Sequence, residues 1–256
     1  MDIEGCSALV TGGASGIGEA SARLLSQRGT RCIIADRNEE RGPEVAEELG
    51  GIFVKTDVTD ETDVETAVGA AVEAGPLRVL INAAGIGNPG RTVDRDGNPL
   101  PLGKFLRVIQ INLVGTFNCV RLVAAAMAKT YPTQPDGQRG AIVNMASVAA
   151  FDGQIGQASY AASKGGIVSM TLPLARDLAS IGVRVNTIAP GLIDTPIYGE
   201  GERAEQFKAN LASNVLFPRR LGSAAELASM VVELVTNDYM NGETVRVDGG
   251  IRMPPK

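Results

Sequence analysis

The feature that most constrains the fold is a regular alternation of short aliphatic runs with longer segments of helical periodicity. The runs are rich in Val and Ile with little polar alternation, which is typical of parallel strands buried on both faces. Strands that alternate with helices predict right-handed βαβ units and a doubly wound α/β fold. We expect a mostly parallel seven-stranded sheet, with strands at residues 7–10, 32–35, 52–55, 79–81, 141–145, 183–188 and 244–247.

The helical segments complete this pattern. One of them, 160–180, contains Gly165, Gly166 and Pro173, which weaken a helix interior unless packing overrides their propensity. Two stretches rich in Pro, Gly and Asp, 87–102 and 129–140, are expected to be loops. No linker or low-complexity run divides the chain, so residues 1–256 are expected to form a single domain. The expected helices are 16–28, 39–49, 61–74, 103–130, 160–180, 201–213 and 224–236.

Composition excludes several kinds of chemistry. The chain contains no histidine, so it has neither a Ser-His-Asp nucleophile nor a His-rich zinc site, and we expect no metal. Proton transfer must then use Tyr, Lys, a carboxyl group or a hydroxyl. A net charge of -5 argues against nonspecific binding of nucleic acid.

Location is predicted from the cysteines and the apolar runs. Cys6, Cys32 and Cys119 lie in apolar contexts and are expected to be buried free thiols in a reducing, cytoplasmic compartment. We see no targeting leader in the first residues. The apolar stretch 119–128 is interrupted by Arg121 and is too short to cross a bilayer, so no membrane partner is expected.

A glycine-rich turn follows the first expected strand. The segment TGGASGIG, residues 11–18, would let the backbone turn tightly and approach a pyrophosphate, which the amides of the following helix would bind. The spacing of Gly12, Gly16 and Gly18 is not the common G-x-G-x-x-G, so the motif alone is weak and could be a plain glycine turn. Its place between the first strand and the first helix favours a dinucleotide site.

The choice of dinucleotide is predicted from Asp36, at the end of the second strand. A carboxylate there can accept hydrogen bonds from the adenosine ribose hydroxyls and repels a 2′-phosphate, which favours NAD over NADP. Arg37 is the residue that a 2′-phosphate would need, whereas Ser15 is neutral. Asp57 and Val58 follow the third strand, where an adenine edge could be read, although Asp57 alone is more often a cap or turn residue.

Tyr160 and Lys164 are four residues apart and so share one face of a helix. Lowering the tyrosine pKa from ~10 by about 3 units requires about 4 kcal/mol of preference for the phenolate. An ammonium about 5 Å away contributes roughly 3 kcal/mol at an effective dielectric of about 20. A positively charged oxidised nicotinamide could supply the remainder. We therefore expect a depressed tyrosine pKa in the oxidation reaction.

Two further polar residues complete a candidate catalytic set. Ser147, at a strand end, could donate a hydrogen bond to a substrate oxygen, and the amide of Asn112 could hold a water between Lys164 and solvent. Each residue also has a structural interpretation: a serine cap, an interhelical hydrogen bond for the asparagine and a solvated lysine. A non-catalytic scaffold would have no physical need for all four together.

On these motifs the sequence resembles the short-chain dehydrogenase/reductase family over essentially the whole chain. The resemblance implies a Rossmann fold, with Tyr160 as general acid/base, Lys164 as its pKa tuner, Ser147 as carbonyl orienter and Asn112 in a proton relay. Ala83 departs from the family, which usually has a second Asn there. The implied cofactor-binding residues are Gly12, Ser15, Gly16, Ile17, Gly18, Asp36, Asp57, Val58, Asn82, Ala83, Gly85, Tyr160, Lys164, Pro190, Gly191, Ile193 and Thr195.

Segments 137–196, 217–222 and 241–255 more closely resemble type II 3-hydroxyacyl-CoA dehydrogenases. This implies reversible NAD-dependent oxidation of an L-3-hydroxyacyl-CoA in fatty acid metabolism by a homotetramer, with Gln154 and Gln157 near the acyl or thioester end. Some relatives oxidise steroid alcohols, and an NADPH-dependent 3-oxoacyl-acyl-carrier-protein reductase shares the fold. We expect segment 192–217 to be a mobile lid. The candidate cations for the CoA phosphates are Arg203, Lys208, Arg219 and Arg220.

Overall fold

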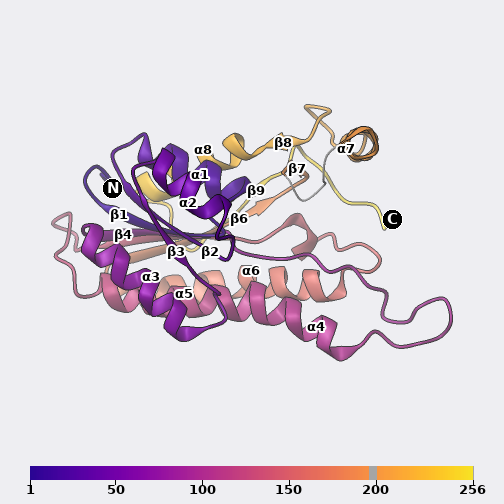
Figure 1. The fold of residues 1–256 in the computed structure, drawn as a ribbon, viewed down its shortest axis with the longest axis horizontal. Helices are drawn as coiled ribbons and strands as arrows, with labels where there is room; N and C mark the ends of the chain where they lie inside the picture. Colours follow the sequence, from indigo (N-terminus) through magenta and orange to yellow (C-terminus); the bar gives the residue numbers. More distant parts are fainter. Residues whose placement is uncertain (196–200, 256) are drawn as a thin grey trace.

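The structure is a computed structural model that describes residues 1–195 and 201–255. A parallel sheet lies between two layers of helices (Figure 1), with strands in the order β3-β2-β1-β4-β5-β6-β9. All neighbouring pairs in this sheet are parallel. The predicted doubly wound sheet of seven strands is therefore confirmed. The strands are β1 Ser7–Thr11, β2 Arg31–Asp36, β3 Ile52–Lys55, β4 Leu77–Asn82, β5 Gly140–Met145, β6 Val183–Pro190 and β9 Thr244–Val247.

Each face of the sheet buries its own apolar cluster. One cluster joins the sheet to α1, α2 and α8, and the other joins it to α3, α5 and α6. Figure 1 shows these helices above and below the sheet, respectively. The helices are α1 Gly16–Ser26, α2 Arg41–Glu48, α3 Glu61–Ala74, α4 Leu102–Ile109, α5 Gly115–Met127, α6 Ala158–Ala179, α7 Glu202–Ala212 and α8 Ala224–Thr236.

The expected single helix over 103–130 is wrong in one respect. A π-helical turn at Gln110–Val114 separates α4 from α5 and contains Asn112. Such turns occur often at functional sites, because the extra residue re-aims a side chain. Hydrophobic periodicity does not report this insertion, so the sequence predicted one continuous helix.

The helix α6 forms despite its weakening residues, with Pro173 inside it. A Cβ atom on Gly166 would lie 2.8 Å from a Leu113 methyl carbon. Glycine at this position therefore allows α6 to approach the π-helical turn closely, and tertiary packing overrides local propensity.

A small second sheet of two strands was not predicted. A short parallel pair joins β7, Ile193–Asp194, to β8, Gly222–Ser223. It lies beside α7 at one end of the molecule, near the C-terminus (Figure 1). The expected loops at 87–102 and 129–140 are nearly free of named elements: α4 begins at Leu102 and β5 begins at Gly140.

The run Leu102–Met127 is long and apolar enough to cross a membrane by length and composition alone, and half of it is buried in the protein. This run is longer than the apolar stretch 119–128 that the sequence pattern indicated. A core helix of an ordinary globular fold passes the same test, and its buried side here packs against the sheet.

The sheet order places the crevice that can hold a ligand. The chain passes from β1 outward to β2 and β3, then crosses back to β4 on the other side of β1. In open parallel sheets, ligands bind outside the carboxyl ends of the strands at such a switch point. The β1–α1 turn and the residues after β4 and β5 meet there.

Candidate active site

A cavity of about 870 Å³ lies at the carboxyl edge of the sheet. Its lining comes from the glycine-rich turn, the ends of β2, β4, β5 and β6, the start of α6, α7 and the C-terminal tail. The structure thus brings together segments from both ends of the chain. The predicted site residues in its lining are Gly12, Ser15, Gly16, Ile17, Gly18, Asp36, Asp57, Val58, Ala83, Gly85, Ser147, Gln154, Gln157, Tyr160, Lys164, Pro190, Gly191, Ile193 and Thr195.

The glycine-rich turn, called the glycine cradle below, brings backbone segments closer together than a side chain would allow. A Cβ on Gly18 would lie 2.1 Å from the Gly12 carbonyl oxygen, and one on Gly12 would lie 2.7 Å from the Ala84 nitrogen. Gly16 has a φ of +53°. Ser15 is the N-cap of α1 but makes no side-chain capping bond, so its hydroxyl and the first amides of α1 can serve a ligand. This geometry fits a dinucleotide pyrophosphate.

Asp36 is held at the end of β2 by two backbone amides. Its carboxylate accepts hydrogen bonds from Ala14 N and Asn38 N, both at 3.0 Å. Arg37 is largely exposed, and its guanidinium lies 3.5 Å from the Asp57 carboxylate. Asp57 also accepts hydrogen bonds from the Thr59 amide and hydroxyl, which together with Arg37 lower its pKa. Asp57 is therefore both a turn residue and a cavity residue.

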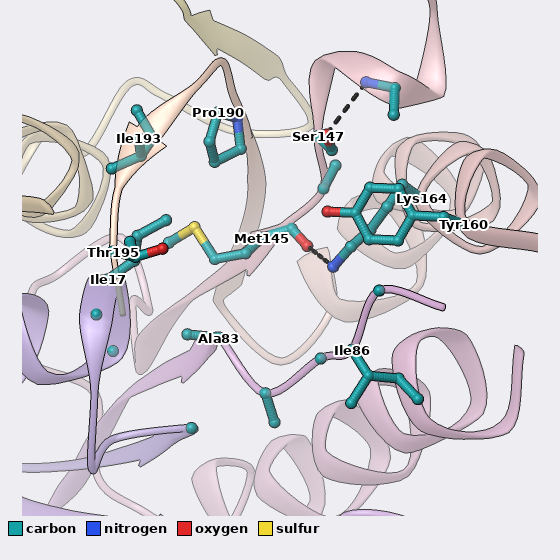
Figure 2. A pocket seen from close by; sticks show the side chains of 18 of the residues that line it. Ile17, Ala83, Ile86, Met145, Ser147, Tyr160, Lys164, Pro190, Ile193 and Thr195 are labelled. Atoms are coloured by element: carbon teal, nitrogen blue, oxygen red, sulfur yellow. Dashed lines mark hydrogen bonds between the residues drawn. The ribbon is translucent and has the colours of Figure 1, made fainter. Parts of the chain in front are cut away.

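Tyr160, Lys164 and Ser147 converge on the same part of the cavity (Figure 2). The hydroxyl end of Tyr160 points toward Ser147, and the nearby Ser147 hydroxyl favours the ionised form of the tyrosine. The Lys164 ammonium lies 5.8 Å from the centre of the Tyr160 ring and donates a hydrogen bond of 2.8 Å to Met145 O. Ser147 Oγ also accepts a hydrogen bond of 3.1 Å from Ala149 N, which fixes the serine at the end of β5.

Burial acts on both charges of this pair. It raises the pKa of Tyr160 above its usual value, and the nearby Ser147 hydroxyl opposes this only in part. Burial also lowers the pKa of Lys164 to about 8. The expected depression of the tyrosine pKa refers to the oxidation reaction with an oxidised nicotinamide present, so it stays a prediction. A positive charge brought into the cavity would oppose the effect of desolvation on Tyr160.

Two predicted residues, Asn112 and Asn82, lie behind the cavity wall and do not line it. The Asn112 amide donates both hydrogens, to Ile86 O and Ser163 Oγ, and its oxygen accepts one bond from Ile86 N. Only the second lone pair of that oxygen remains for the predicted water. Asn82 donates to Asn144 Oδ1 inside the sheet. Asn112 therefore fixes the segment after β4 through Ile86, whereas Asn82 joins β4 to β5.

The residues expected around the substrate have more structural partners than predicted. Gln154 Nε2 donates to Pro254 O at 2.9 Å, and Gln157 Oε1 accepts from Gln154 N at 3.0 Å. Lys208 is paired with Asp194 and Glu205. Neither it nor the other candidate cations, Arg203, Arg219 and Arg220, are in the lining of this cavity. The expected lid at 192–217 lies partly outside the described residues, and its mobility stays a prediction.

Sequence reasoning missed much of the apolar lining. These residues lie beside predicted motifs or in α7 and the C-terminal tail, and no spacing rule marks them. Adjacency to a predicted site residue was the available signal; for example, it would have identified Ala146 and Val148 beside Ser147 and Leu192 beside Gly191. The remaining lining residues are Ala35, Arg37, Thr56, Ala84, Ile86, Gly87, Asn88, Pro89, Ile111, Met145, Ala146, Val148, Ala149, Leu192, Phe207, Leu211 and Met253.

Comparisons with known proteins agree with this geometry. Residues 7–206 match the family model for short chain dehydrogenases. The chain is 48% identical to 3-hydroxyacyl-CoA dehydrogenase type-2 of Homo sapiens, covering 99% of this chain and 97% of the relative. It is also 48% identical to the Drosophila melanogaster protein of that name, covering 99% and 100% of the two chains.

A solved structure extends the likeness to three dimensions. The crystal structure of 3-hydroxyacyl-CoA dehydrogenase type-2 from Mycobacterium avium superposes with a TM-score of 0.94 at 46% identity, covering 99% of this chain and 98% of that one. The Rossmann-type sheet, the glycine cradle and the Tyr160–Lys164 pair are the features that a nicotinamide-dependent oxidoreductase acting on CH–OH groups needs. This chain belongs to the short-chain dehydrogenase family.

Proposed function

We propose that this chain is an NAD-dependent 3-hydroxyacyl-CoA dehydrogenase, which interconverts an L-3-hydroxyacyl-CoA and the 3-oxoacyl-CoA. The observation that carries the proposal is the convergence of Tyr160, Ser147 and Lys164 on a cavity that also contains the glycine cradle. The substrate class is supported by near-full-length relatives that carry this name.

Side chains of this protein transfer the proton and orient the substrate hydroxyl. In the oxidation direction, the Tyr160 phenolate takes the proton of the substrate hydroxyl, and Ser147 donates a hydrogen bond to the same oxygen. The Lys164 ammonium stabilises the phenolate across the tyrosine ring. The glycine cradle and Asp36 would hold the nicotinamide cofactor, which would supply the acceptor for the substrate hydride in oxidation and the hydride donor in the reverse direction.

The preference for NAD rests on Asp36. Its carboxylate lines the cavity and is fixed by the Ala14 and Asn38 amides, so it cannot easily move away from a 2′-phosphate. Arg37 is engaged by Asp57 on the other side. We expect NADH to be oxidised with acetoacetyl-CoA far faster than NADPH. Equal use of the two cofactors would refute this role of Asp36.

The decisive experiment is a substrate panel assayed with NADH. The panel contains 3-oxoacyl-CoA esters, the matching acyl-carrier-protein thioesters and oxo-steroids. We expect kcat/KM to be highest for a short or branched 3-oxoacyl-CoA. Preference for the carrier-protein thioester would instead identify a reductase of fatty acid synthesis, against which Asp36 argues because that rival uses NADPH.

A second candidate is a dehydrogenase for steroids or other bulky secondary alcohols. The observation that favours it is the apolar lining from Phe207, Leu211 and Met253, with none of the four candidate phosphate-binding cations in the cavity wall. A higher kcat/KM for an oxo-steroid than for any acyl-CoA would establish this alternative.

We also propose that the protein is a cytoplasmic homotetramer. Support for assembly comes from apolar side chains that α4 and α5 leave exposed, including Leu106 and Phe117. Support for a reducing location comes from Cys6, Cys32 and Cys119, which are buried and unpaired. The mass of the native protein in solution tests the assembly.

A further inference from the structure

The last described residues of the chain form part of the cavity wall. Met253 lines the cavity together with Phe207 and Leu211 of α7. It also packs against the buried cluster that contains Val148 and Ile251. Because Val148 follows Ser147 directly, Met253 lies beside the segment that carries the proposed proton-transfer site.

The tail is fixed on both sides of Met253. Before it, Arg246 Nη2 donates a hydrogen bond of 2.9 Å to Ile251 O, and Ile251 is only 1% exposed. After it, Gln154 Nε2 donates to Pro254 O at 2.9 Å and Ile155 N donates to Pro255 O at 3.0 Å. Met253 is thus held in the wall by neighbours on either side, although it lies close to the chain end.

Arg246 also joins the tail to the segment 151–155. Arg246, on β9, pairs with Asp152 at 2.8 Å and with Asp248 at 2.7 Å. Its guanidinium also lies 5.2 Å from the centre of the Phe151 ring. The segment 151–155 and the tail 248–255 therefore form one connected unit.

Gln154 holds this unit at its inner end. Its side-chain amide is bonded to the tail, and its backbone amide is bonded to Gln157 Oε1 at 3.0 Å. The glutamine was expected to touch the acyl or thioester end of the substrate, and this stays a prediction because Gln154 lines the cavity. Its bond to Pro254 O also makes it a support for the neighbouring residue, Met253.

We propose that Met253 limits the size of the group that the cavity accepts, and that Gln154 is the positioning residue that keeps Met253 in the wall. The identity of that group as an acyl chain rests on the function proposed above. Methionine is unbranched and flexible, so its side chain fills irregular space in a cavity wall. Shortening Met253 to alanine removes this side chain, while the backbone hydrogen bonds that hold the tail are kept.

The test compares Met253→Ala with the wild-type enzyme on acetoacetyl-CoA and 3-oxooctanoyl-CoA with NADH. We expect the ratio of kcat/KM, long over short, to rise about tenfold or more, because each methylene that fits an apolar pocket is worth at least that. Met230→Ala is the matched control. Met230 is half-buried on α8, where it packs against the apolar cluster that joins the sheet to α1, α2 and α8. It does not line the cavity, so its variant should keep the wild-type ratio.

A second variant tests the positioning role. Gln154→Glu keeps the size of the side chain, but its carboxylate cannot donate to Pro254 O. We expect the long-over-short ratio to rise in this variant as well. If Gln154 acts through Met253, the double variant will show the same ratio as Met253→Ala alone, whereas independent effects would multiply.

The outcomes separate the two proposals. An unchanged ratio in Met253→Ala, with NADH binding intact to show that it folds, overturns the size limit while wild-type turnover of acetoacetyl-CoA still supports the proposed function. An unchanged ratio in Gln154→Glu overturns its positioning role. If the wild type reduces no acyl-CoA, the proposed function fails. The size limit is then tested with a small and a bulky ketone that the wild type reduces, by comparing the ratio of kcat/KM, bulky over small, between Met253→Ala and the wild type.

Discussion

At the scale of single residues, the candidate site depends on two charges that burial opposes. Burial raises the pKa of Tyr160 and lowers that of Lys164 to about 8, so at neutral pH the tyrosine is neutral and most of the lysine is still an ammonium. The Tyr160 phenolate that the proposed oxidation needs would be stabilised by Lys164 and by positive charge brought into the cavity.

Removing the hydroxyl of Tyr160 should slow the chemical step without weakening the binding of the cofactor. We expect Tyr160→Phe to lower kcat by about 10²–10⁴-fold, the usual contribution of a positioned acid or base, with little change in NADH affinity. Steady-state kinetics and NADH fluorescence titration measure the two effects. Tyr131→Phe is the matched control, since Tyr131 is 89% exposed. A Tyr160 variant that keeps most of its rate would refute the assigned base.

Burial of Lys164 should be visible in the pH dependence of stability. Its folded pKa of about 8 is lower than the ~10.4 of an unfolded lysine. Between these values the unfolded chain binds more protons, so this residue makes stability rise with pH. Relative to Lys164→Met, the wild type should gain about 3 kcal/mol of unfolding free energy between pH 7 and pH 10.5.

Urea unfolding of both proteins at several pH values measures this difference. Comparing the two removes the contribution of groups that titrate equally in each. A difference that stays constant from pH 7 to pH 10.5 would show that Lys164 is not desolvated as the structure indicates.

At the scale of elements, close backbone approaches decide where the site residues lie. The β1–α1 turn brings Gly18 against the Gly12 carbonyl, and α6 approaches the π-helical turn at Gly166. The turn and the alternation of strands with helices were predictable because glycine spacing and apolar periodicity are local signals. The π-helical turn around Asn112 was not predictable, because it adds one residue to a helix without changing its composition.

Two glycine substitutions should have opposite effects. Gly18→Ala places a carbon 2.1 Å from a backbone oxygen, so we expect a loss of about 1–3 kcal/mol of stability and weaker NADH binding. Gly69→Ala, in the interior of α3 with open space around it, should add about 0.5–1 kcal/mol. Thermal unfolding with and without NADH measures both. Equal effects of the two substitutions would contradict the cradle geometry.

At the scale of the whole molecule, the cavity joins distant parts of the chain, from Gly12 in the first turn to Met253 in the tail. A ligand that fills it contacts only the folded state. We therefore expect NADH at a hundred times its Kd to raise the unfolding free energy by about 2.7 kcal/mol.

The shift should be smaller with NADPH at the same concentration, because Asp36 disfavours the 2′-phosphate. It should persist in Tyr160→Phe, which keeps the binding surface. Thermal scans over a range of cofactor concentrations measure it, and a melting temperature independent of NADH would argue against a cofactor in this cavity.

The sequence by itself determined the sheet, the glycine turn and the chemistry of Tyr160, Lys164 and Ser147, because these depend on periodicity, fixed spacing and functional groups. Only the tertiary structure decided the direction of the pKa shifts, the placement of Asn82 and Asn112 behind the wall, and the bond from Gln154 to the tail. Burial and contacts between residues about 100 positions apart set these properties, and no local pattern in a chain records them.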